Sequence, residues 1–117
     1  ITAEALTLAQ KIGLDLNTFK EVNAGTTANN GQFHINFLSK VLKNDIEPGF
    51  TIDLAHKDMG LAIETANSFR VGLPVGSSVQ AVYGQARSGK FAKKDFSALL
   101  DYACELAEVD PPRIKKS

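Results

Sequence analysis

The 117 residues match the usual size of one folded domain, and a composition of 44% hydrophobic and 22% charged residues is ordinary for a globular protein. Thirteen basic and thirteen acidic side chains cancel to a formal net charge of +0, so no net field draws the chain to nucleic acid or to an anionic membrane. No apolar run approaches the roughly 20 residues of a membrane-spanning helix, and the start does not resemble a signal peptide. We therefore expect a soluble intracellular protein with no nucleic-acid or membrane partner.

The start of the chain has the features of an internal segment. The chain opens at Ile1 directly on helix-forming residues, with no capping sequence before them, and its only methionine is Met59. We therefore expect the sequence to be a piece of a longer protein.

The apolar residues of the first 25 positions predict two helices. From Ile1 to Ile12 they recur at steps of three and four, the spacing of one helix face, and Gly13 follows where a left-handed terminating glycine belongs. Asp15 is then placed to cap a second helix, which stops at Ala24-Gly25.

A third helix is predicted from Phe33 to Lys43, after a small and polar loop over residues 26–31. Asn44 is placed to stop this helix. A turn follows at Glu47-Pro48-Gly49, since proline presets φ and glycine accepts a positive one.

The longest predicted helix runs from about Ile52 to Arg70 and is ended by Gly72. We expect it to be the central helix of the fold. Its apolar residues share one side: Leu54, Leu61, Ala62, Ala66 and Phe69.

Two further helices are predicted after a short extended connector, Leu73-Pro74-Val75, because the residue before a proline is pushed out of the helical region. One helix spans roughly Ser77 to Ser88 and is closed by Gly89. The other begins at the cap Asp95 and runs to Ala107.

About six amphipathic segments and no convincing period-2 strand predict the all-α class, as a single compact bundle of about six helices with one long central helix. The helical domain is expected to span residues 1–109. Pro111 and Pro112 cannot continue a helix, which indicates a flexible tail over residues 110–117.

Two binding motifs are weak when their context is considered. Gly84 to Lys90 satisfies the GxxxxGK part of a phosphate-binding loop, but Phe91 replaces the hydroxyl residue that binds magnesium, and the segment lies at a helix end instead of after a strand.

His34 and His56 fall into no ligand pattern, and Asp53 with His56 supplies two of the four ligands of a structural zinc site. The sequence therefore predicts no metal.

Hydrolytic catalysis also has no positive support. No serine, histidine and acid are arranged as a nucleophile motif. The one cysteine, Cys104, has no partner for a disulfide and no basic neighbour in sequence, and it lies in an apolar helical pattern that indicates a small core residue.

The start of the longest predicted helix offers charged residues for binding. Asp53 and Lys57 are four positions apart with the acid first, which is typical of an ordinary solvated helix pair. In the functional interpretation, Lys57 projects a fixed cation toward a bound anion or a reacting carbonyl. Asp58 is open to a structural role as well, accepting hydrogen bonds from a neighbouring helix. The residues alone do not decide between these interpretations.

Short motifs follow one another in a fixed order from about Ala3 to Leu106. They are Ala3-Glu4-Ala5-Leu6 with Ala9, Gly13-Leu14-Asp15, Pro48-Gly49-Phe50, Lys57-Asp58-Met59-Gly60-Leu61-Ala62, Gly72-Leu73-Pro74, Gly89 and Asp95-Phe96-Ser97-Ala98. Together they resemble the C-terminal domain of the β-hydroxyacid dehydrogenase family, of the 3-hydroxyisobutyrate dehydrogenase and tartronate semialdehyde reductase type. The resemblance implies a helical fold similar to the C-terminal domain of 6-phosphogluconate dehydrogenase.

The resemblance also implies where the chemistry lies. An N-terminal Rossmann domain of the same chain would bind NAD or NADP, and a catalytic lysine would lie on a helix upstream, so that this sequence holds no catalytic residue and is inactive alone. Within this sequence the resemblance assigns Lys57 to cofactor binding and Phe50 and Asp58 to the substrate pocket. Met59 stands where leucine is commoner in the family.

The function implied is that of an NAD(P)-dependent oxidoreductase interconverting a small 3-hydroxy acid and its semialdehyde. The resemblance further implies a homo-oligomer, in the cytoplasm or alternatively in the mitochondrial matrix. The alternative from another class is a non-enzymatic all-α interaction module, for which the helix, loop and helix around Ala24 to Asn30 is the best support and the lack of a basic stripe the main objection. A family relative that has lost catalysis also stays open.

Overall fold

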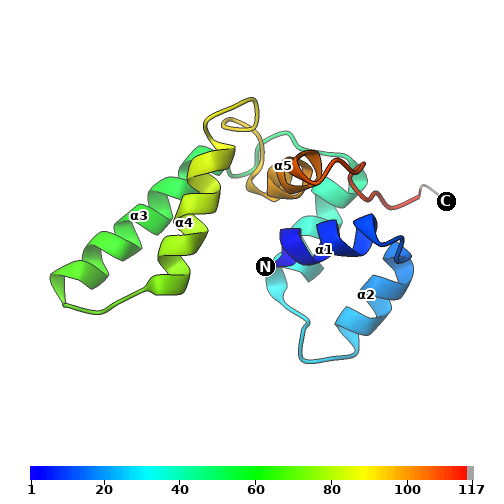
Figure 1. Ribbon diagram of the computed structural model, residues 1–117, viewed down its shortest axis with the longest axis horizontal. Helices are drawn as coiled ribbons and strands as arrows, with labels where there is room; N and C mark the ends of the chain where they lie inside the picture. Colours follow the sequence, from blue (N-terminus) through cyan, green and yellow to red (C-terminus); the bar gives the residue numbers. More distant parts are fainter. Residues whose placement is uncertain (116–117) are drawn as a thin grey trace. The chain divides into compact units, whose positions relative to one another are not determined.

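The computed structural model describes residues 1–115, and the regular elements of these residues are all helices (Figure 1). The predicted all-α class is confirmed. The elements are α1 (Thr2–Lys11), α2 (Leu16–Ala24), the π-helix η1 (Gln32–Phe37), the 3-10 helix η2 (Val41–Lys43), α3 (Ile52–Ser68), α4 (Pro74–Ala86), the 3-10 helix η3 (Phe96–Ala98) and α5 (Leu99–Leu106). Within residues 1–115, none of these helices combines the length and the apolar character that crossing a membrane requires.

The chain divides into two compact units, a division that the sequence did not predict. We call residues 1–46 with 100–115 the terminal unit, and Glu47–Leu99 the hairpin unit. The terminal unit holds α1, α2, η1, η2 and nearly all of α5. The hairpin unit holds α3, α4 and η3.

The terminal unit has an apolar core drawn from α1, the segment around η1 and η2, and α5. Its buried side chains are Ala3, Leu6, Ala9, Phe33, Phe37, Val41, Leu42, Leu100 and Cys104. The predicted start and stop signals of the first two helices are confirmed. Gly13 has a φ of +79° after α1, and the Asp15 carboxylate accepts a hydrogen bond from the Thr18 backbone N–H at 3.0 Å at the start of α2.

Cys104 is a buried core residue, as predicted. Its Sγ lies 3.5 Å from the Thr7 hydroxyl. Burial raises the pKa of the Cys104 thiol above its ordinary value, with a further increase from the Asp101 carboxylate, while the Thr7 contact acts in the opposite direction. The thiol is therefore the stable form at neutral pH and is poorly suited to nucleophilic chemistry.

The prediction of a third α-helix is wrong in the type of helix. Instead of one α-helix over Phe33 to Lys43, the chain forms the π-helix η1 and then the 3-10 helix η2. Phe33, Phe37 and Val41 are all buried at steps of four, and a step of four overshoots one turn of an α-helix. Phe33 and Phe37 lie in the π-helix η1, and Val41 follows in the 3-10 helix η2. Asn44, with a φ of +62°, ends the segment as predicted.

Residues 110–115 of the predicted flexible tail make specific contacts with the terminal unit, while residues 116–117 lie outside the described residues. The Ile114 N–H donates to the Leu42 carbonyl at 2.7 Å. The Arg113 guanidinium donates to the Asp101 carboxylate at 2.8 Å and to the Asn44 side-chain oxygen at 3.1 Å.

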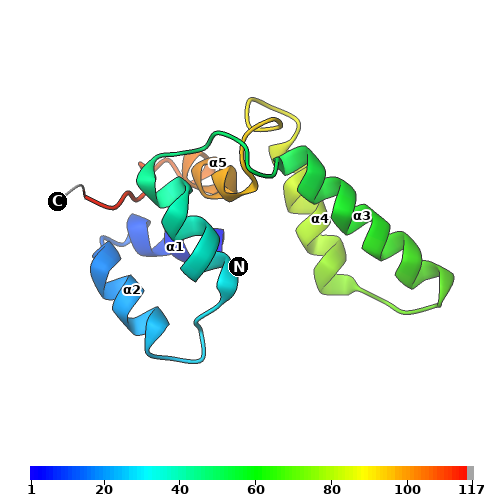
Figure 2. The ribbon, with the colours of Figure 1, turned by 180° about the vertical axis from the view of Figure 1, so that it is seen from behind.

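In the hairpin unit, α3 and α4 run side by side as an antiparallel pair, seen from both sides in Figures 1 and 2. The longest helix is α3, as predicted, but much of its predicted apolar side is exposed: Leu61 is 54% and Phe69 77% accessible. The side of α3 that faces α4 instead carries Gly60. A Cβ built on Gly60 would lie 2.9 Å from the Gln80 amide nitrogen, so the absence of a side chain allows a close approach.

The boundaries between α3 and α4 differ from the prediction. The turn after α3 uses Arg70, with a φ of +58°, rather than Gly72 as the left-handed residue. The predicted extended connector Leu73-Pro74-Val75 is wrong beyond its first residue, because α4 begins at Pro74 and ends at Ala86. Proline suits the first helical position, where its fixed φ is helical and its missing N–H would have had no partner.

Candidate functional site at the start of α3

Phe50 is held in place by a segment more than 40 residues further along the chain. Thr51 and Asp95 form an isolated antiparallel bridge, and the Phe96 N–H donates to the Phe50 carbonyl at 2.6 Å. The Asp95 carboxylate oxygen Oδ1 accepts hydrogen bonds from the N–H groups of Gly49 at 3.0 Å and Phe50 at 3.2 Å. The half-buried Phe50 ring meets the Phe96 ring edge to face at 5.8 Å between centroids. Both the backbone and the ring of Phe50 are therefore fixed.

The backbone amides at the N-terminus of α3 are already satisfied. The N–H of Ile52 donates to the Lys94 carbonyl at 3.0 Å and that of Asp53 to the Ala92 carbonyl at 3.1 Å. The N–H of Leu54 donates to the Thr51 hydroxyl at 3.1 Å, which makes Thr51 the N-cap. Helix N-termini bind anions through free amides, so an anion bound near this helix has to be held by side chains instead.

Lys57 and Asp58 lie together on the exposed surface of α3. The Lys57 Nζ is 3.0 Å from the Asp58 Oδ1, and the two side chains are 58% and 53% exposed. An ammonium group has three N–H donors, and this contact engages one of them. The contact with Asp58 therefore leaves donors of Lys57 for other acceptors.

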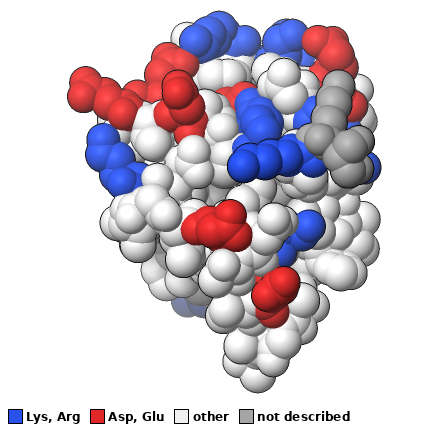
Figure 3. Space-filling view, turned by 90° about the vertical axis from the view of Figure 1, so that its right-hand side faces the viewer, with Lys and Arg blue, Asp and Glu red and all other residues white. Residues whose placement is uncertain are grey.

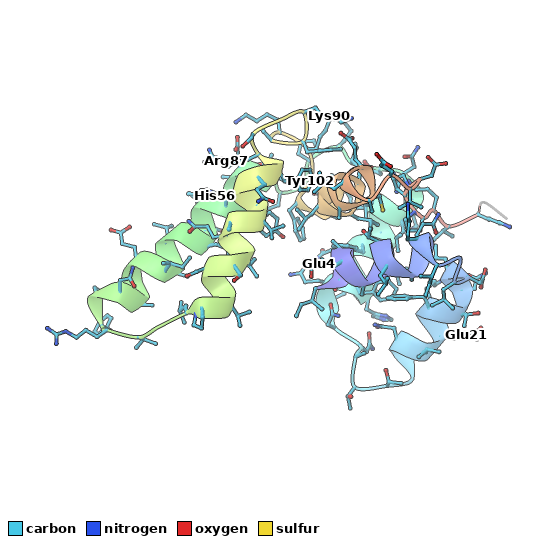
Figure 4. All side chains as sticks on the ribbon, viewed as in Figure 1. Glu4, Glu21, His56, Arg87, Lys90 and Tyr102 are labelled. Atoms are coloured by element: carbon cyan, nitrogen blue, oxygen red, sulfur yellow. The ribbon has the colours of Figure 1, made fainter. Side chains whose placement is uncertain are left out.

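The predicted pair between Asp53 and Lys57 is not the pair that forms. The Asp53 carboxylate instead contacts Lys93 Nζ at 2.7 Å and Arg87 Nε at 2.8 Å. The same Arg87 lies 3.3 Å from the ring nitrogen Nδ1 of His56, and Figure 4 labels these two side chains, directly after α4 and on α3. These contacts connect the first turns of α3 to the end of α4 and the loop that follows it.

The hydrogen bond and charge of Lys93, followed by those of Arg87, hold the pKa of Asp53 below its ordinary value. Asp53 is therefore a charged structural anchor at neutral pH. Within residues 1–115, histidine, cysteine, aspartate and glutamate nowhere gather in a group of three that would hold a metal ion.

Tyr83 lies on α4 in the same unit. Burial raises the pKa of Tyr83 above its ordinary value, and the negative charge of Asp95 raises it further. Tyr83 therefore stays protonated near neutral pH.

The segment that matches part of a phosphate-binding loop has local structural contacts. A Cβ built on Gly84 would lie 3.5 Å from the His56 ring, and the Ser88 hydroxyl donates to the Gly84 carbonyl at 3.0 Å. The Lys90 ammonium lies 5.2 Å from the centre of the Phe91 ring. The segment occupies the end of α4 and the following loop, as the sequence indicated. On the molecular face drawn in Figure 3, basic side chains are interspersed with acidic ones.

Sequence reasoning placed Phe50, Lys57 and Asp58 within one short stretch, and the structure shows each of them at the start or along the first half of α3. It missed that Asp95, predicted only as a helix cap, also binds the backbone of Phe50. It also missed the partners of Asp53, because Arg87 and Lys93 are distant in sequence and charge spacing along one helix does not report them.

The family model describing the NAD-binding domain of NADP-dependent 3-hydroxyisobutyrate dehydrogenase matches residues 1–103. The chain therefore belongs to this family of β-hydroxyacid dehydrogenases.

Individual relatives agree with this assignment. The chain is 40% identical over 101 residues to 3-sulfolactaldehyde reductase of Escherichia coli (strain K12), a match that covers 86% of the chain and 34% of the relative. It is 30% identical over 98 residues to 2-(hydroxymethyl)glutarate dehydrogenase of Eubacterium barkeri, covering 84% of the chain and 33% of the relative. The solved structure of 3-hydroxyisobutyrate dehydrogenase of Mycobacterium tuberculosis with L-serine matches with a TM-score of 0.77 and 32% identity, over 86% of this chain and 36% of that one. The chain thus spans about a third of the length of these relatives.

Proposed function

We propose that this chain is the C-terminal domain of an NAD(P)-dependent oxidoreductase that interconverts a small 3-hydroxy acid and its semialdehyde. The family match supports an oxidoreductase, and the relatives are named for reduction or dehydrogenation of small acids and aldehydes. The observation that carries the proposal is the position of Lys57. Its ammonium group is exposed on α3, in the same short stretch as Phe50 and Asp58.

In this proposal Lys57 contacts the NAD or NADP cofactor, which supplies or accepts the hydride. Its chemistry fits, since an ammonium is a compact cation suited to phosphate or carboxamide oxygens, and the satisfied amides of α3 leave side chains as the available donors. Phe50 supplies an apolar wall for the substrate, and its hydrogen-bonded backbone keeps that wall rigid. Asp58 orients Lys57 and borders the substrate.

We further propose that a Rossmann domain of the same chain, carrying the catalytic lysine, covers part of this surface. The exposed apolar side of α3, with Leu61 and Phe69, offers area for that contact and for homo-oligomer contacts. A cytoplasmic location, with the mitochondrial matrix as the alternative, fits a chain whose single cysteine is free and buried.

The test compares residues 1–117 with the whole protein that contains the dinucleotide-binding domain. NAD(P)H consumption is followed with a panel of small semialdehydes, including 3-sulfolactaldehyde and the semialdehyde of 3-hydroxyisobutyrate. We expect turnover by the whole protein with at least one of them and none by residues 1–117 alone. A folded whole protein that binds neither NAD nor NADP would contradict the proposal and favour an interaction module.

A further inference from the structure

Asp95 is a buried carboxylate whose two oxygens have different partners. It is 3% exposed. Its Oδ2 accepts from the backbone N–H of Ser97 at 3.1 Å and from the Ser97 hydroxyl at 2.5 Å, and so caps η3. Its Oδ1 reaches back along the sequence to the N–H groups of Gly49 and Phe50.

A helix cap alone does not require this residue. One oxygen is enough for capping, and serine caps helices about as well as aspartate. Burial of a carboxylate is costly unless several hydrogen bonds compensate it, and among the described residues no ion pair joins Asp95 to a cation. The two donors on Oδ1 therefore explain why a carboxylate, and not a hydroxyl, is suited to this position.

The contacts of Asp95 converge on Phe50. The carboxylate fixes the Phe50 N–H, the next residue Phe96 donates to the Phe50 carbonyl, and the Phe96 ring meets the Phe50 ring edge to face. Loss of Oδ1 would release the amide side of Phe50 and leave the N–H groups of exposed Gly49 and half-buried Phe50 without their acceptor. The expected consequence is a shift or loosening of the Phe50 ring.

We propose that Asp95 is a positioning residue, which sets the place of Phe50 in the substrate pocket through its Oδ1. This inference rests on the proposed function, in which Phe50 lines that pocket. Asp95 does not touch substrate in this role and acts through the 49–50 backbone.

Two substitutions separate capping from positioning. Asp95→Ser keeps a capping oxygen for Ser97 and removes the acceptor for Gly49 and Phe50. Ser97→Ala is the matched control, since it removes a donor to Oδ2 and leaves the Oδ1 contacts in place. In the whole enzyme we expect Asp95→Ser to lower kcat/KM for the semialdehyde by about 10- to 100-fold, the range that misplacement of a binding group by about 1 Å produces, with the KM for NAD(P)H unchanged. Ser97→Ala should lower kcat/KM clearly less than Asp95→Ser does, because Oδ2 keeps the Ser97 backbone N–H and the Oδ1 contacts are not removed.

A double-mutant cycle with Phe50→Leu distinguishes positioning from a general loss of structure. If Asp95 acts through Phe50, the combined variant should be no worse than Phe50→Leu alone. Independent, multiplying losses would overturn the inference. A Phe50→Leu enzyme with wild-type kcat/KM would instead overturn the proposed role of Phe50, so the two failures are distinguishable.

Asp95→Asn is the second variant in case Asp95→Ser does not fold. Its carboxamide keeps the volume but offers one acceptor, so it cannot serve both sets of donors. We expect a loss of kcat/KM in the same direction, and displaced backbone amide NMR signals of Gly49 and Phe50 that Ser97→Ala does not displace. Displaced Gly49 and Phe50 amide signals with wild-type kinetics, or a loss of kcat/KM with unchanged amide signals, would overturn the inference.

Discussion

Both the terminal unit and the hairpin unit contain helices whose apolar residues recur at helical spacing, but the two units bury these residues differently. In the terminal unit each of α1, η1, η2 and α5 contributes large apolar residues to one core, while other apolar residues of these helices stay exposed. The buried ones are Leu6, Phe33, Phe37, Val41, Leu42 and Leu100, and the exposed ones are Leu8, Ile35 and Leu106. In the hairpin unit the buried residues, such as Ile52, Ala86 and Phe91, lie near the start of α3 and the end of α4, whereas Leu61 and Phe69 are exposed. Helical apolar spacing therefore predicts which side of a helix is apolar, but not whether the chain itself covers that side.

The largest expected difference between the units comes from shortening one leucine in each. Leu100 is fully buried and Leu61 is 54% exposed. Leu100→Ala should lower the free energy of unfolding by about 2–5 kcal/mol, because it removes buried methyl groups and leaves a cavity. Leu61→Ala should change it by less than about 0.5 kcal/mol. Denaturant unfolding of each variant measures both values, and a large loss in Leu61→Ala would show that the apolar side of α3 is covered in solution.

A smaller effect is expected where α3 approaches α4. Gly60→Ala should gain up to about 1 kcal/mol of helix propensity, reduced by the displacement of the Gln80 amide that lies in the path of the new Cβ. In a Gln80→Ala background the gain should approach its full value. Thermal or denaturant unfolding in both backgrounds makes the comparison. Destabilisation in both backgrounds would show that the α4 backbone, and not the Gln80 side chain, limits the approach.

The smallest expected effect concerns the charged contacts of Asp53. Because the pKa of Asp53 is lowered in the folded chain, its charge contributes stability above the ordinary value of 3.8, and that contribution is lost as the pH falls through the folded pKa. Asp53→Asn should therefore be less stable than the wild type near neutral pH, with the difference shrinking at acidic pH. In roughly 1 M salt, where the Debye length is about 3 Å, the neutral-pH difference should also shrink. A difference that grows on acidification would mean that the ion pairs do not stabilise the fold.

Local signals in the sequence were sufficient for much of the fold. Gly13, Asp15, Asn44 and Asp95 end or begin helices as predicted, because capping depends on the residue itself and its near neighbours. The π turn of η1 was not predictable in the same way, since it arises from the burial of several side chains in one core.

For the candidate site, sequence motifs proposed Phe50, Lys57 and Asp58 but did not report the residues that contact them. The contacts of Asp95 with Phe50 and of Asp53 with Arg87 join residues more than 30 positions apart. Such contacts depend on the tertiary arrangement, and no periodicity along a single helix reports them. Charge spacing along the helix favoured a pair between Asp53 and Lys57. In the structure Asp53 pairs with Arg87 and Lys93 instead.

The most direct measurement is the affinity of the whole protein for NAD(P)H, determined by fluorescence titration of the wild type, Lys57→Ala and the control Lys43→Ala, an exposed lysine of the terminal unit. If Lys57 contacts the cofactor, Lys57→Ala should raise the Kd by about 10-fold or more, the loss expected for one charge-assisted hydrogen bond, while Lys43→Ala leaves it unchanged. An unchanged Kd and an unchanged turnover number in a folded Lys57→Ala protein would remove Lys57 from the site and contradict the proposed role of this surface.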